Sequence, residues 1–166
     1  TEAWYDILLN DHVVGYERWR TLAEQGSLTV ESRQTLAIHR RGRRRHLVSQ
    51  QRLLLDGASR ELVHLNALLS TTQSRFQIQG WRHPRGFLLS LPRKGERLLP
   101  LPHPLLAEAS LGIQLAALPW RPQQRRTFLL LEPSTTHGED ITIAYQGSST
   151  YRMTYRGLTL NLSLNE

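Results

Sequence analysis

Apolar and polar residues alternate with a period of two through nearly the whole chain, and turn residues interrupt the alternation. Side chains of a β-strand point alternately to opposite faces, so this period predicts strands rather than helices. The clearest case is residues 28–39, where Leu28, Val30, Leu36 and Ile38 share one face. We expect strands over residues 4–9, 13–22, 28–39, 45–55, 61–70, 74–82, 86–91, 97–101, 125–132, 140–145, 150–155 and 158–164.

One segment departs from this rhythm. Residues 104–118 are rich in Leu, Ala, Glu and Gln and lie between two prolines, which predicts a single helix. Short connections between the strands favour antiparallel pairing, and a flat sheet of so many strands is unfavourable. We therefore predict a mainly β fold: an antiparallel meander of about ten strands, curled into a barrel or half-barrel, with the helix over 104–118 covering its open side. Residues 1–166 are expected to form a single β-rich domain.

The basic residues are concentrated at one predicted hairpin. The chain has a formal net charge of +7, and five arginines fall within six positions: Arg40, Arg41, Arg43, Arg44 and Arg45. Guanidinium groups suit phosphates and carboxylates, so this tip predicts an anionic partner, such as an envelope lipid headgroup, an acidic glycan or an acidic protein surface. The alternative is a solvated hairpin tip without a partner. Nucleic acid is not expected, because aromatic residues do not interleave with the arginines.

A second candidate site follows from the pairing of the same hairpin. A turn centred on Gly42 and Arg43 makes the numbers of facing residues sum to 85, so that Gln34 faces Gln51 and Leu36 faces Ser49. The shared face is then apolar at both ends and polar in the middle. We interpret it as a concave ligand-lining face, with Gln34, Ser49 and Gln51 as hydrogen-bonding groups. The alternative is that these groups satisfy each other or water.

Catalytic and metal-binding patterns are scarce. The same register places His39 opposite His46, which we interpret as a surface pair, since a metal site needs at least a third ligand. Cysteine is absent, and none of the common nucleophile, phosphate-loop or zinc-peptidase motifs occurs. We therefore predict no catalytic residues, no metal and no cofactor. An enzyme with a site that the sequence does not reveal is the remaining alternative.

Two stretches carry a resemblance to known families. The opening Trp4–Tyr16 run has a strand, a short turn and a Val-Gly-Tyr second strand, and it resembles the start of DUF3108-like bacterial extracytoplasmic β domains. It equally resembles the β-rich N-terminal domain that precedes bacterial transglutaminase-like cores. The later segments 98–102, 111–112, 118–122 and 128–134 fit the same families. The resemblance implies an exported accessory domain without catalytic residues of its own.

These observations lead to a ranked set of functional expectations. The first is a non-enzymatic periplasmic or envelope accessory domain that binds an anionic ligand, a protein partner or a fused catalytic domain. The second is a carrier of lipid or another amphiphile in a half-barrel cavity. The chain opens directly on a strand-like run, which we interpret as a piece of a longer exported protein. No apolar stretch approaches the 18 residues of a membrane span, so no transmembrane segment is expected.

Overall fold

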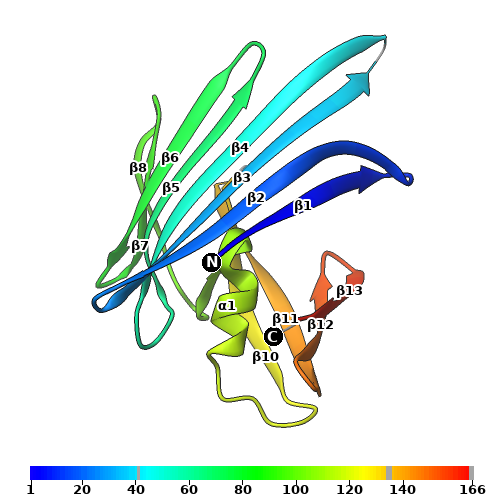
Figure 1. Ribbon diagram of the computed structural model, residues 1–166. Helices are drawn as coiled ribbons and strands as arrows, with labels where there is room; N and C mark the ends of the chain where they lie inside the picture. The colour runs from blue at the N-terminus through cyan, green and yellow to red at the C-terminus, as the bar shows by residue number, and fades with distance from the viewer. Residues whose placement is uncertain (41, 134–135, 165–166) are drawn as a thin grey trace.

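The computed structural model shows a mainly β protein built from two sheets, with a short helix packed on the second sheet (Figure 1). It describes residues 1–40, 42–133 and 136–164, and of residues 38, 40 and 43 it describes the backbone only. The predicted fold class is confirmed, with thirteen strands in place of about ten. The described strands curl but do not close into a barrel.

The first sheet is an eight-stranded antiparallel meander in which each strand pairs with the next along the chain. Its order therefore follows directly from the short turns between the strands. The strands are β1 (Glu2–Leu9), β2 (His12–Glu24), β3 (Ser27–Arg40), β4 (Arg43–Asp56), β5 (Leu62–Thr71), β6 (Arg75–His83), β7 (Gly86–Leu91) and β8 (Gly95–Leu99).

The second sheet has five strands in the order β13-β12-β11-β10-β9. Its members are β9 (Leu105–Ala107), β10 (Arg125–Glu132), β11 (His137–Gly147), β12 (Thr150–Tyr155) and β13 (Leu158–Ser163). Neighbouring strands are antiparallel except for β9 and β10, which are parallel. The proline-rich segment 100–104 joins the two sheets. It does not continue the first sheet, because proline has no backbone N–H to donate to a neighbouring strand.

The predicted helix is much shorter than expected. Residues 105–107 form β9 and 108–110 a 3₁₀ turn, η1 (Glu108–Ser110), so that α1 covers only Leu111–Ala116. The physical reason is a distant partner: Leu105–Ala107 pairs with Leu129–Leu131 of β10, and such tertiary pairing overrides local helix propensity. No helix among the described residues is long and apolar enough to cross a membrane.

The register of the β3–β4 hairpin differs by two residues from the prediction. Facing residues sum to 83, because Arg40 pairs with Arg43. Gly42 has a φ of 72°, the left-handed conformation expected of a glycine at this turn. A shift of two leaves every side chain on its predicted face, although each residue has a different partner.

Two apolar clusters hold the sheets together. The first lies between the meander and the edge of the second sheet, and it joins Val30, Leu53 and Leu65 to Leu129 and Leu131. The second lies between α1 and the other face of the second sheet; its buried members are Leu106, Leu115, Phe128, Ile141, Ile143, Tyr151 and Met153. The helix therefore covers the face of the second sheet opposite to the first cluster, and the hairpin ends of the meander extend beyond the second sheet (Figure 1).

Candidate ligand-binding cleft

Polar side chains form a belt across the inner face of the meander, which is the face that carries the core residues. Gln34 pairs with Ser49, and Ser32 pairs with Gln51, so all four residues share that face. The predicted facing of Gln34 with Gln51 is therefore wrong, but both side chains and Ser49 do line one cavity of about 220 Å³. The cavity wall is otherwise largely apolar and is contributed by Leu47, Ala67, Leu69, Phe76 and Ile78.

Gln51, which lines this cavity, carries an unsatisfied polar atom. The residue is only 8% exposed, and its Oε1 atom is buried and has no hydrogen-bond partner among the described residues. Buried polar atoms are nearly always paired in folded proteins, so an unpaired acceptor on a residue that lines a cavity is a candidate partner for a hydrogen-bond donor.

A second cavity, of about 630 Å³, adjoins the first at Glu108, which lines both. It opens between β2, the helix segment and the end of the second sheet, and its lining includes Tyr5, Glu17 and Trp19. We call the two cavities together the inner cleft. The cleft is therefore hydrophobic along much of its length and polar around Glu108.

Three carboxyl groups converge near this junction. The carboxylate of Glu17 accepts a hydrogen bond of 2.7 Å from Ser32 Oγ, and Glu132 lines the first cavity beside Glu108. Glu108 is an exposed residue, but partial desolvation of its carboxyl group, and then the charges of Glu132 and Glu17, raises the pKa of that group. None of the described residues that line either cavity is Lys or Arg. The cleft therefore offers hydrogen-bond acceptors and negative charge.

The segment that carries Glu108 is fixed from both ends. Trp19 Nε1 donates to Ala109 O over 3.0 Å, which joins η1 to β2. Gln114 Oε1 accepts from the Ala107 N–H at 3.0 Å and from Ser110 Oγ at 2.9 Å, while its Nε2 donates to Leu105 O at 3.1 Å. These bonds are buried, and they satisfy polar atoms of the short strand β9 that would otherwise lack partners.

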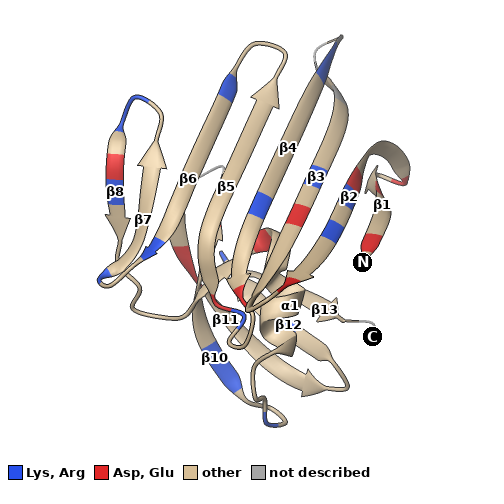
Figure 2. Ribbon diagram, turned by 60° about the vertical axis from the view of Figure 1, so that its left-hand side comes forward, with Lys and Arg blue, Asp and Glu red and all other residues tan. Residues whose placement is uncertain are grey.

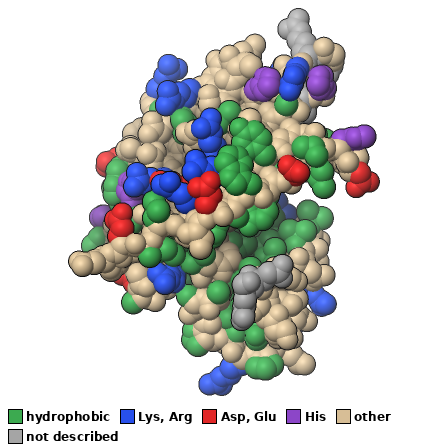
Figure 3. Space-filling view, viewed as in Figure 1, with side chains coloured by type: hydrophobic (Ala, Val, Ile, Leu, Met, Phe, Trp, Pro, Cys, Tyr) green, Lys and Arg blue, Asp and Glu red, His purple; other side chains and the backbone are tan. Residues whose placement is uncertain are grey.

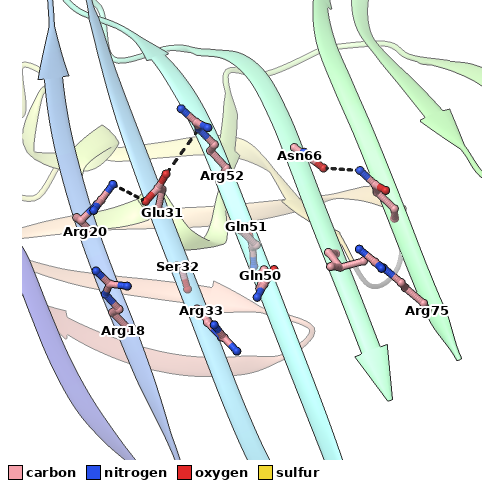
Figure 4. Close-up of a pocket in the computed structure, with 12 residues that line it drawn as sticks. Arg18, Arg20, Glu31, Ser32, Arg33, Gln50, Gln51, Arg52, Asn66 and Arg75 are labelled. Carbon is pink, nitrogen blue, oxygen red and sulfur yellow. Dashed lines mark hydrogen bonds and ion pairs between the residues drawn. The ribbon is translucent and has the colours of Figure 1, made fainter. Parts of the chain in front are cut away.

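The outer face of the meander carries a separate cavity of about 360 Å³ lined by five arginines (Figure 4). Part of its charge is compensated by two carboxylates: Arg18 binds Glu2 at 2.9 Å, and Glu31 binds both Arg20 at 3.1 Å and Arg52 at 3.7 Å. The two remaining arginines, Arg33 and Arg75, form no ion pair among the described residues. This face is basic, but it is less specific as a ligand site than the inner cleft.

The arginine tip lies at the far end of β3 and β4. Arg44 and Arg45 are exposed there, as predicted. Arg41 lies outside the described residues, as do the side chains of Arg40 and Arg43. The predicted facing of His39 and His46 is wrong, because His39 pairs with Arg44 and His46 with Ala37. No group of three or more His, Asp or Glu side chains suited to a metal occurs in the described part of the chain.

Sequence reasoning missed the acidic part of the cleft. Alternation places Glu17 on the inner face once its pairing with Gln34 is known, so a correct β2–β3 register would have identified it. No local pattern indicates that Glu108 and Glu132 lie beside it, because they come from η1 and from the end of β10. Their convergence depends on how the second sheet packs under the first.

The fold and the cleft define the class of protein: an open β protein of two sheets, with a cleft that has an apolar wall and several polar side chains. Among solved structures, it is similar to the crystal structure of a DUF1089 family protein (PA1994) from Pseudomonas aeruginosa, with a TM-score of 0.60 and 14% identity over 97% of this chain and 89% of that chain. No family model matches, and no curated protein matches.

This similarity corrects the resemblance that the sequence suggested. The structural neighbour comes from DUF1089, a different family from DUF3108 and from the domains that precede transglutaminase-like cores. The quoted motifs misled because a strand, a tight turn and a second strand are general features of antiparallel β folds and do not identify a family. At 14% identity the likeness establishes a shared fold and leaves the ligand to be argued from the cleft.

Proposed function

We propose that the protein binds an amphipathic small molecule in the inner cleft and does not transform it. The apolar part of the ligand lies against the Phe76 and Ile78 wall, and its polar end lies near Gln51 and Glu108. The unpaired, buried Oε1 atom of Gln51 is the observation that carries this proposal. It supports a function as a carrier or binding protein for an amphiphile.

The chemistry of the cleft narrows the polar end of the ligand. Carboxylates and the Gln51 carbonyl accept hydrogen bonds, so the matching ligand group donates them, as hydroxyl or ammonium groups do. An anionic end would meet Glu17, Glu108 and Glu132 with no basic residue in the described lining to compensate. We therefore expect hydroxyl- or amine-bearing amphiphiles to bind, and fatty acids or alkyl sulfates to bind poorly.

Two neighbouring glutamines provide a matched test. Gln51 faces the cleft, while Gln50 lies on the outer face of the same strand. We expect Gln51→Leu to weaken binding of dodecylamine about tenfold, which corresponds to the loss of one hydrogen bond to a charged group. Gln50→Leu should bind like the parent. Equal affinity of the parent and Gln51→Leu, measured by displacement of a neutral fluorescent probe, would contradict the proposal.

A second candidate function is binding of an anionic partner through the basic end of the meander. The exposed Arg44 and Arg45 favour it, since guanidinium groups pair readily with phosphates and carboxylates. We propose that this activity operates in an extracytoplasmic setting, in which the domain serves as an accessory to other envelope components. Loss of binding to anionic partners at raised salt would support it, because exposed charges are screened.

A further inference from the structure

We propose that one end of the meander docks onto an anionic lipid bilayer, with the β1–β2 hairpin inserted among the lipids. The proposal deepens the second function above by naming its partner. The relevant end is formed by the described residues of four hairpin ends, 8–13, 38–40, 42–47, 70–76 and 91–96, which we call the hairpin rim. In an antiparallel meander the β1–β2, β3–β4, β5–β6 and β7–β8 connections all lie at the same end of the sheet.

Charge is strongly polarised along the meander. The hairpin rim contains seven Lys or Arg residues and two acidic residues, a net charge of +5 compared with +7 for the whole chain. Connections at the opposite end, residues 23–28, 56–61 and 82–87, contain three acidic and three basic residues, so their net charge is zero. Figure 2 shows basic residues at the free ends of the β3–β4, β5–β6 and β7–β8 hairpins, besides others along the strands. Such a distribution orients the molecule at an anionic surface.

Exposed apolar side chains lie at one corner of this rim. Of ten exposed large hydrophobic residues among the described ones, six belong to the β1–β2 hairpin. Leu8, Leu9 and Val13 beside the turn are 60%, 54% and 63% exposed, and the exposed aromatic residues Trp4, Tyr5 and Tyr16 follow further from the turn. Figure 3 shows hydrophobic side chains on this flank, with basic and His side chains above them. In a bilayer, aliphatic side chains lie among the acyl chains and aromatic side chains lie at the level of the headgroups. The aliphatic tip of this hairpin and the aromatic residues behind it follow the same order.

This combination favours a bilayer over a second copy of the chain. A contact between two hairpin rims would bring a net charge of +5 against another of +5, which is repulsive. A soluble polyanion would neutralise the arginines but would leave Leu8, Leu9 and Val13 in water. An anionic bilayer satisfies both features, because its headgroups pair with guanidinium groups and its acyl chains accept the aliphatic tip.

The same corner borders the mouth of the inner cleft. Tyr5 of β1 lines the larger cavity, and Leu164 lines it from the end of the second sheet. On β13, the exposed Leu158 and Leu160 lie on the same face as Leu162 and continue the apolar surface outward. Docking of the rim would thus bring the mouth of the cleft close to the lipids. An amphiphile could then pass between the bilayer and the cleft.

The test compares vesicles of phosphatidylcholine alone with vesicles that also contain phosphatidylglycerol, at low and at physiological salt, using flotation. We expect binding only to the anionic vesicles, and weaker binding at the higher salt. Arg44→Ser with Arg45→Ser should lower the affinity about tenfold or more, since each basic residue near an anionic surface contributes appreciably. Leu8→Ser with Leu9→Ser should also weaken binding, by removal of inserted aliphatic groups.

Matched controls separate this proposal from the others. Arg121→Ser with Arg125→Ser removes the same charge from exposed sites outside the hairpin rim and should leave more binding than the rim variant. Gln51→Leu should bind vesicles like the parent, so failure of the cleft proposal leaves docking unaffected. Equal binding of the parent and the Arg44/Arg45 variant overturns docking. Insertion into a bilayer is overturned if the Leu8/Leu9 variant binds vesicles as well as the parent does. It is also overturned if the parent is a dimer and this substitution converts it to a monomer.

Discussion

At the scale of single residues, the cleft combines groups that stability alone would disfavour. Gln51 buries an acceptor without a partner, and Glu108 keeps a carboxyl near two others in a partly desolvated place. Unsatisfied polar atoms and like charges both cost stability, and proteins keep them most often where a ligand needs them. The alternation of the sequence predicted the face of Gln34, Ser49 and Gln51, because a register error of two residues does not change which face a side chain takes.

Glu108 gives a pH-dependent prediction. Its pKa in the folded state is raised, so the folded state binds a proton more readily than the unfolded state. Its ionisation therefore lowers the free energy of unfolding as pH rises from the ordinary value of 4.5 through the raised pKa. We expect Glu108→Gln to stabilise the protein at pH 7 and to give a smaller gain at pH 4. Urea unfolding measures this, with the exposed Glu24→Gln as control. If Glu108→Gln raised the free energy of unfolding equally at both pH values, the Glu108 carboxylate would not be destabilised by desolvation and by the charges of Glu17 and Glu132.

At the scale of elements, the short strand β9 and the turn η1 are the segments whose secondary structure the local sequence does not predict. Leu, Ala and Gln over residues 104–118 favour a helix, and a helix does form over Leu111–Ala116. The preceding residues join β10 in a parallel pairing that depends on a segment more than twenty positions away. Local propensity predicts neither that pairing nor the position of Glu108, which follows from it.

Gln114 provides the test at this scale. Its side chain is buried and bonds to Ala107, Ser110 and Leu105, so it ties β9 to α1. We expect Gln114→Leu to lower the free energy of unfolding by about 2 kcal/mol, because it leaves buried backbone groups without partners. The exposed Gln25→Leu should change it by less than about 0.5 kcal/mol. A Gln114→Leu variant as stable as the parent in urea would show that this network does not fix η1.

At the scale of the whole molecule, the sheet breaks where three prolines crowd residues 100–104, and the second sheet then packs under the first. Composition and alternation predicted a curled antiparallel β protein. The sequence does not show that the curl is completed by a separate sheet, because strands in both sheets have the same two-residue period. The result is a molecule with two opposite chemistries: a basic rim outside and an acidic, apolar-walled cleft inside.

That contrast leads to the central claim, which is that the inner cleft selects amphiphiles whose polar end donates hydrogen bonds. The direct measurement is displacement of a neutral fluorescent probe by dodecylamine, dodecyl maltoside and dodecanoate, which share a twelve-carbon chain, below their micelle concentrations at one pH and salt. We predict that dodecylamine and dodecyl maltoside bind the parent at least about tenfold more tightly than dodecanoate, since an anionic end meets Glu17, Glu108 and Glu132. Dodecanoate binding as tightly as the other two, or no displacement by any of them, would contradict the account.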